Sequence, residues 1–209
     1  MKPTYNRIAG DSVERVEALS DGIFAVAMTL LVLDLHVPAR ATIHSEEQLW
    51  VALRAMLPQI VTCLMSFLTL SIFWTGQQAQ LSRFAHTNRH LSWIQLAFLF
   101  FVTLLPFSTL LLAEYIEYRT ALVLYWANIF LLGGVLLVSW KYASRAGLVT
   151  QGTPAEVGKA IERRIVVAQS LYAFGALLCI FDTWASIGFI VLVQLNFAIA
   201  PRLGFLSRF

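Results

Sequence analysis

Six long, mostly apolar stretches constrain the fold of this chain more than any other sequence feature. They lie at residues 19–37, 49–75, 91–112, 121–140, 165–181 and 184–200. A helix needs about 20 mostly apolar residues to cross the hydrocarbon core of a bilayer. Because 58% of the 209 residues are hydrophobic and only 13% are charged, the chain has too little polar surface for a soluble domain. The sequence therefore predicts an all-α polytopic membrane protein, a single transmembrane domain (1–209) with six transmembrane helices.

The lysines and arginines indicate how these helices are oriented. Twelve of the 15 fall in the N-terminal segment, the second-to-third connection, the fourth-to-fifth connection and the C-terminal segment: Lys2, Arg7, Arg15, Arg83, Arg89, Lys141, Arg145, Lys159, Arg163, Arg164, Arg202 and Arg208. The opposite side has Arg40 and Arg119, with Arg54 just inside the second stretch. Since basic connections are retained in the cytoplasm, we expect both termini to be cytoplasmic.

The first apolar stretch differs from the others because a carboxylate flanks it at each end. Between Asp21 and Asp34 the uninterrupted apolar run covers only 12 residues, about 18 Å of helix against a hydrocarbon core of about 30 Å. A carboxylate near the membrane is costly unless it meets a partner or water. We expect this helix to face other protein or an aqueous cavity.

The spacing of the apolar residues places them in one stripe along a face of this first helix. The stripe consists of Leu19, Gly22, Val26, Leu30, Leu33 and Val37, with Thr29 on one shoulder and Ile23 on the other. Asp21 falls almost opposite, so a stripe that lines a pore would leave Asp21 buried in its own subunit beside a base or a hydroxyl. Periodicity alone favours the other interpretation, in which the stripe is ordinary helix packing.

Two segments and one tryptophan carry a resemblance to a known family. The segment from Arg15 to Gly22, RVEALSDG, resembles the RxxxFSD signature that opens the first helix of the transmembrane protein 175 family of potassium channels, with Leu19 in place of the Phe. The segment FVTLLPFSTLL, from Phe101 to Leu111, resembles the third helix of the bacterial members, and Trp74 matches a tryptophan near the end of their second. The likeness covers all six stretches in order and is specific in the first three.

The resemblance implies a potassium-selective channel in the bacterial cell (inner) membrane. Bacterial members are homotetramers in which the first helix of each subunit lines a central path for K⁺. The family's apolar constriction maps onto Val26, Leu30 and Leu33, and Thr29 matches a position where some members place a ring of hydroxyls. The expected partners are the other three copies, the bilayer and the permeating K⁺. No cofactor, no other metal and no nucleic acid are expected.

The motif residues Arg15, Ser20, Asp21 and Gly22 are interpreted as a structural network, because Asp21 points away from the stripe. Many bacterial relatives have Asn-His-His after the tryptophan, whereas this chain has Gly76, Gln77 and Gln78, and Gln95 stands where an Asn is common. The network is therefore expected to differ here. Asp34 lies at the outer end of the helix, where it either concentrates cations at the mouth or is simply a solvated helix end.

Two other functions were weighed against a channel. An intramembrane enzyme is disfavoured because Asp21 and Asp34 are 13 residues apart, about 20 Å along a helix and too far for a carboxylate dyad. The sequence also has no HExxH, no GxSxG and no Gly-rich phosphate loop. A proton- or cation-coupled secondary transporter stays the alternative. Transporters of this class commonly have helices interrupted by Gly or Pro at corresponding positions in two halves of the chain, and Pro58 and Pro106 do not form such a pair.

Overall fold

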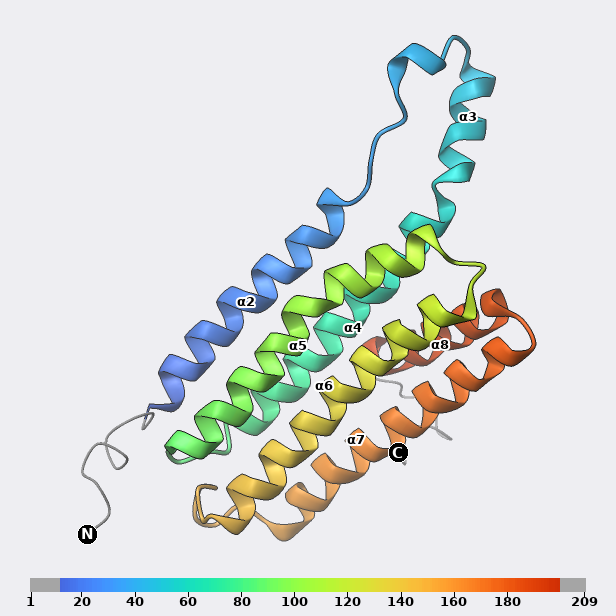
Figure 1. Cartoon of the computed structure of the whole chain (residues 1–209). Helices are drawn as coiled ribbons and strands as arrows, with labels where there is room; N and C mark the ends of the chain where they lie inside the picture. The colour runs from blue at the N-terminus through green and yellow to red at the C-terminus, as the bar shows by residue number, and fades with distance from the viewer. Residues whose placement is uncertain (1–11, 200–209) are drawn as a thin grey trace.

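The structure is a computed structural model that describes residues 12–199. Figure 1 shows a bundle of long helices in which neighbours along the chain run antiparallel. The described residues form seven α-helices: α2 (Val13–Leu33), α3 (Glu46–Ala55), α4 (Leu57–Leu81), α5 (Arg89–Glu114), α6 (Arg119–Arg145), α7 (Ala155–Leu177) and α8 (Thr183–Ile199). Five of them are long and apolar enough to cross a membrane, and α8 is a shorter apolar helix. The prediction of an all-α membrane protein is confirmed.

Some residues used in the sequence analysis lie outside the described range. They are the basic residues near the two ends, Lys2, Arg7, Arg202 and Arg208, and the last residue of the sixth apolar stretch, Ala200.

Helix α4 lies at the centre of the bundle and orders the other helices around it. It packs against α2, α5, α6 and α8, while α7 packs against α6 and α8. Helix α2 lies at one edge of the bundle, where it packs against α4 and α5 (Figure 1). One face of α2 therefore has no neighbour among the helices of the described residues.

Local sequence signals explain where several helices begin and end. Ser12, Ser45 and Asn88 each accept a hydrogen bond from the backbone N–H three residues later, at the start of α2, α3 and α5. After α6, Gly147 has a φ of 70°, a left-handed conformation that glycine adopts readily. The connections α4–α5 and α6–α7 then meet at one end of the bundle, where the N–H of Ala85 donates to the carbonyl of Leu148 (2.9 Å).

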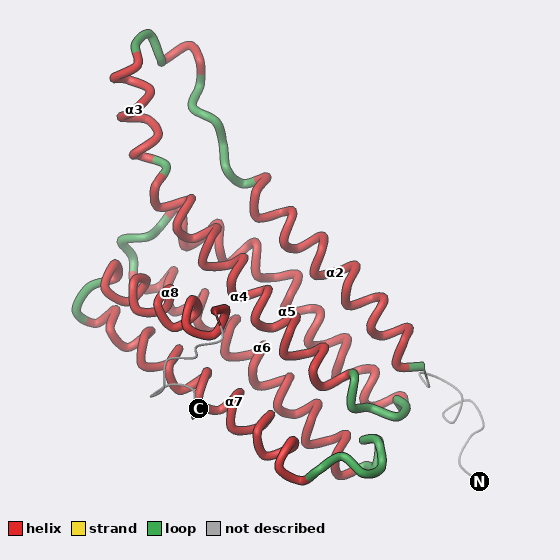
Figure 2. Tube along the Cα trace, turned by 180° about the vertical axis from the view of Figure 1, so that it is seen from behind, coloured by secondary structure: helices red, strands yellow, loops and turns green. Residues whose placement is uncertain are grey.

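The second apolar stretch, 49–75, was expected to be one helix, and this prediction is wrong. The chain breaks at Met56 between α3 and α4, because Pro58 lies in the first turn of α4 and has no N–H to bond to Arg54. None of the residues of α3 is buried, and α3 projects beyond the bundle in Figures 1 and 2. Helix α4 starts later than expected and continues to Leu81.

The first stretch also ends earlier than expected. Helix α2 stops at Leu33, with Asp34 as its C-terminal cap, four residues before the end of the apolar stretch 19–37. Val37 lies in the connection that follows α2, and 88% of its surface is exposed. Val37 is therefore not part of the helical stripe, which ends at Leu33.

A layer of hydroxyl and amide groups lies inside the apolar core. The Tyr125 hydroxyl is 3.1 Å from both Ser66 Oγ and Thr69 Oγ1, Thr109 Oγ1 donates to Ser66 Oγ (2.6 Å), and Gln194 Nε2 donates to Thr69 Oγ1 (2.6 Å). These five residues come from α4, α5, α6 and α8, and all are buried. Because lipid offers no alternative partners, such bonds hold helices together and fix their alignment.

Replacing Tyr125 with Phe removes one hydroxyl from this layer and leaves the ring in place. We expect the free energy of unfolding to fall by about 1 kcal/mol, because Ser66 and Thr69 lose a partner in the apolar interior. Unfolding in mixed detergent micelles measures the change. Tyr118→Phe is the control, since 65% of that residue is exposed. Equal stability of the two variants would contradict the assigned role.

Candidate pore-lining helix

Helix α2 presents the remaining residues of the apolar stripe away from the rest of its subunit. The exposed fractions are 46% for Leu19, 57% for Val26, 42% for Leu30 and 73% for Leu33. Gly22 is also exposed, and a Cβ added there would meet no atom within 4 Å. Within the described part of the subunit, the stripe is therefore largely left out of the packed interior. The described helices leave this face largely uncovered.

The opposite face of α2 is held by aromatic and aliphatic packing. Phe24, Ala27 and Leu31 are all at most 2% exposed. The Phe24 ring lies 6.1 Å from the Phe98 ring of α5, and Phe98 in turn lies 6.3 Å from Phe73 of α4. Burying Phe24 between these two helices fixes the rotation of α2 about its own axis, and this rotation directs the stripe outward.

Thr29 lies on the exposed side of α2, between Val26 and Leu30. Its hydroxyl donates a hydrogen bond to the carbonyl of Val26 (2.8 Å). With its hydrogen engaged in this way, the Thr29 oxygen keeps its lone pairs for another group. The residue can offer an oxygen to a cation that approaches the exposed face.

Asp21 joins α2 to α4 through two hydrogen bonds. Its Oδ1 accepts from Trp74 Nε1 and from Gln78 Nε2, both at 2.8 Å. The expectation that Asp21 would be buried beside a base or a hydroxyl is wrong, because its residue surface is exposed in the single subunit and its partners are an indole and an amide. Its carboxylate nevertheless bonds within its own subunit.

Ser20 starts a continuous chain of buried hydrogen bonds across four helices. Its hydroxyl donates to Gln77 Oε1, Gln77 Nε2 donates to Gln95 Oε1 (2.8 Å), and Gln95 Nε2 donates to Ser139 Oγ (2.7 Å). All four residues, from α2, α4, α5 and α6, are at most 1% exposed. We call this set the buried amide chain.

The buried amide chain shows what the sequence analysis found and what it missed. In the sequence, Gln77, Gln78 and Gln95 stand out only as departures from the family pattern. In the structure, Gln77 accepts from Ser20, Gln78 donates to Asp21, and Gln95 accepts from Gln77 as the next residue of the chain. Ser139 was missed altogether. Its signal is a single serine near the end of a mostly apolar stretch, which is too common to have singled it out.

The remaining motif residue, Arg15, is not brought to Asp21. Its side chain is exposed, and it forms no ion pair among residues 12–199; its backbone N–H bonds to Ser12 Oγ (3.3 Å). The structure therefore joins Ser20 and Asp21 to α4 but leaves Arg15 separate.

Asp34 lies at the other end of α2, where its carbonyl oxygen is 2.9 Å from His36 Nδ1. A negative side chain at a helix C-terminus is unfavourable for the helix dipole, so helix stability does not account for an aspartate here. Among residues 12–199, this end of α2 included, no group of three or more His, Cys, Asp or Glu residues could hold a metal ion.

Comparison with known proteins connects this geometry to a family. The family model described as the endosomal/lysosomal potassium channel TMEM175 matches residues 15–106, which span the α2 stripe, α4 and most of the α5 helix. A potassium channel of Chamaesiphon minutus is 32% identical over 190 residues, which are 88% of this chain and 93% of the relative. A potassium channel of Streptomyces collinus is 40% identical over 103 residues, 49% of this chain and 48% of that protein.

The structural comparison gives the same result. The crystal structure of a lysosomal potassium-selective channel TMEM175 homolog from Chamaesiphon minutus matches with a TM-score of 0.76 and 28% sequence identity, covering 90% of this chain and 96% of that one. The likeness thus extends well beyond the first three apolar stretches and covers nearly the whole chain. By sequence and by structure, this chain belongs to the TMEM175 family of potassium channels.

Proposed function

We propose that this protein is a potassium-selective channel in which four copies place the exposed stripe of α2 around a common axis. The observation that carries the proposal is the exposure of Val26, Leu30 and Leu33 on a helix whose opposite face is locked into its own subunit. One helix cannot enclose a path for ions, so lining a pore requires further copies. The potassium channels among the relatives support K⁺ as the permeant ion.

The exposed face of α2 is better suited to close protein contact than to lipid. Ala18, Gly22 and Ala25 are exposed small residues on the N-terminal half of the helix, and small residues let helices approach closely in membranes. Thr29 adds a hydroxyl and Asp34 a carboxylate at the outer end. A lipid-facing surface would gain nothing from either polar group, whereas a path for cations would.

In this arrangement, rings of Leu30 and Leu33 form the narrow part of the pore, and Val26 forms a third ring. An apolar ring that cannot hydrogen-bond to water empties when narrow, and a cation then meets a large dehydration barrier. Widening the ring restores water and conduction. The Thr29 oxygen lies beside these rings and partly replaces the lost hydration of K⁺, while Asp34 raises the cation concentration at the mouth.

Asp21 and the buried amide chain act as structural supports for the pore. They connect α2 to α4, α5 and α6, and they leave the stripe facing the common axis. Neither the Asp21 carboxylate nor Ser20 is proposed to contact the permeating ion.

The proposed topology has six transmembrane helices in a bacterial inner membrane, with α8 as the sixth and both termini in the cytoplasm. Arg15, Arg83, Arg145 and Lys159 support the orientation. They lie near the start of α2, the end of α4, the end of α6 and the start of α7, which meet at one end of the bundle (Figure 1). Basic residues at one end favour its retention in the cytoplasm.

Replacing Leu30 or Leu33 with Ala widens the proposed rings. We expect a higher K⁺ flux, by about tenfold or more, and a lower ratio of K⁺ to Na⁺ flux, because the dehydration barrier falls. Liposomes that contain the purified protein allow both fluxes to be measured, together with proton flux, on one preparation.

The control for this experiment is Leu124→Ala on α6. It removes the same atoms from a side chain that is 50% exposed, on a helix that is not a main neighbour of α2. Unchanged fluxes in both α2 variants would show that Leu30 and Leu33 do not line the narrow part of the pore. Fluxes that saturate at turnover rates typical of alternating access would instead support the secondary transporter.

The common axis can be tested without measuring flux. In a background with Cys63 and Cys179 replaced by Ser, Val26→Cys is expected to form disulfides between copies under mild oxidation, because four equivalent side chains meet at the axis. Denaturing electrophoresis detects the dimers. Leu124→Cys, placed away from the axis, should stay monomeric. Equal cross-linking at both positions would argue against α2 at the centre.

Asp21→Ala removes the acceptor of two hydrogen bonds to α4. We expect a clearly lower yield of assembled tetramer and unchanged ion selectivity of the tetramer that remains. Size-exclusion chromatography and the liposome assay give the two values. Asp21→Asn, which keeps an acceptor oxygen, should recover most of the yield. Normal yield with altered selectivity would instead place Asp21 in the permeation path.

A further inference from the structure

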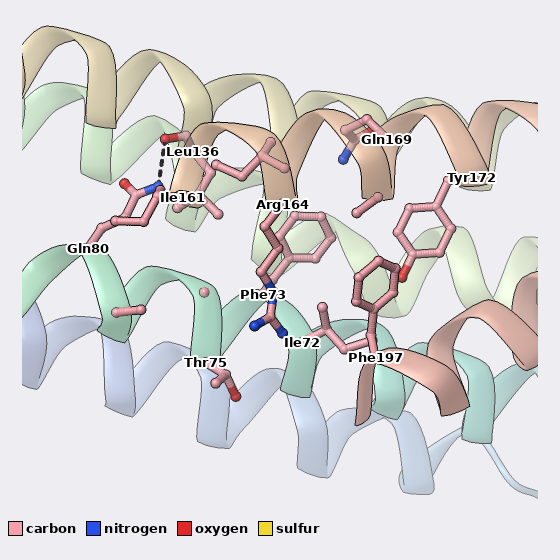
Figure 3. Close-up of a pocket in the computed structure, with 14 residues that line it drawn as sticks. Ile72, Phe73, Thr75, Gln80, Leu136, Ile161, Arg164, Gln169, Tyr172 and Phe197 are labelled. Atoms are coloured by element: carbon pink, nitrogen blue, oxygen red, sulfur yellow. Dashed lines mark hydrogen bonds between the residues drawn. The ribbon is translucent and has the colours of Figure 1, made fainter. Parts of the chain in front are cut away.

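A pocket of about 110 Å³ lies between α4, α6, α7 and α8 (Figure 3). Most of its wall is apolar and includes Ile72, Ile165, Ala168 and Phe197. The pocket lies on the side of α4 that faces away from α2. Its occupant would therefore bind outside the proposed pore.

Three buried polar atoms in the wall of this pocket have no hydrogen-bond partner in the described structure. They are Gln80 Oε1, Gln169 Oε1 and the Tyr172 hydroxyl. Gln80 is fully buried and Tyr172 is 1% exposed. The Gln80 amide nitrogen donates to the carbonyl of Leu136 (3.1 Å; Figure 3), whereas its oxygen has no donor among the described residues. Unpaired polar atoms in an apolar interior are costly, so their gathering in one pocket points to a ligand.

Arg164 places a positive charge in the same pocket. Its guanidinium lies between Gln80 at one end and Tyr172 at the other in Figure 3, with its Cζ 5.9 Å from the centre of the Phe197 ring. No carboxylate is found among the described lining residues. Arg164 immediately precedes the apolar stretch 165–181, a position where basic side chains reach the level of lipid phosphates.

We propose that this pocket binds an anionic glycerophospholipid whose headgroup carries a hydroxyl. The order of groups along the pocket matches that of such a lipid. The headgroup hydroxyl donates to Gln80 Oε1, the phosphate binds Arg164, the ester carbonyl accepts from the Tyr172 hydroxyl, and an acyl chain contacts the apolar wall near Phe197. A choline headgroup has no donor for Gln80. The site does not depend on the proposed channel function, since no residue of the α2 stripe contributes to it.

Native mass spectrometry of the purified protein tests this site, with phosphatidylglycerol, phosphatidylethanolamine and phosphatidylcholine of identical acyl chains as probes. We expect phosphatidylglycerol to bind most tightly. Arg164→Gln should weaken its binding by about tenfold, because a charge-assisted contact is lost. Lys159→Gln is the matched control, since it removes one charge from the same helix outside the pocket. Equal binding of the three lipids, or equal binding by the two variants, would overturn the proposal.

Two further variants locate the lipid independently of charge. Tyr172→Phe should weaken phosphatidylglycerol and phosphatidylethanolamine binding by a similar factor, because both lipids have the same ester carbonyl. Ala168→Phe fills the pocket without changing any charge and should abolish tight phosphatidylglycerol binding. Thermal unfolding of each variant in detergent confirms that it is folded. Retained tight binding by folded Ala168→Phe protein would place the lipid elsewhere and overturn the assignment.

Discussion

The absence of water in a bilayer interior forces buried polar side chains to pair with one another, and this constraint fixes the position of α2. Ser20, Gln77, Gln95 and Ser139 satisfy each other across four helices, each amide donating to the next residue. A rotation of α2 would break the first bond and withdraw Phe24 from its contact with Phe98. The same contacts therefore determine both the stability of the bundle and the direction of the apolar stripe.

Two polar layers at different levels of the bundle both align the helices. The buried amide chain connects α2 to α4, α5 and α6, and the layer around Tyr125 connects α8 to α4, α5 and α6. Apolar packing alone permits helices to slide in lipid, since the hydrocarbon tails are as apolar as the side chains. Specific hydrogen bonds at two levels oppose both sliding and rotation. Helix α4 takes part in both layers, which agrees with its central place.

The membrane class could be predicted because long apolar stretches are a local property of the sequence. Helical spacing located the stripe of α2, but spacing alone favoured ordinary packing, and the exposure of the stripe is visible only in the folded subunit. Hydropathy could not separate 49–55 from 57–75, since Trp50, Val51 and Leu53 look like membrane residues although they lie exposed on α3. Pro58 is visible in the sequence, but it interrupts a helix only where the residues before it are also helical, and the sequence does not show this. The partners of Asp21 could not be predicted, because Trp74 and Gln78 are more than 50 residues away and the fold alone brings them to it.

The chemical composition of the buried amide chain has a consequence for how the protein responds to acid. Serine hydroxyls and glutamine amides do not take up or release protons across the physiological range, unlike histidine, whose charge changes near neutrality. The attachment of α2 through Ser20 therefore keeps the same charge state whether the surroundings are acidic or alkaline.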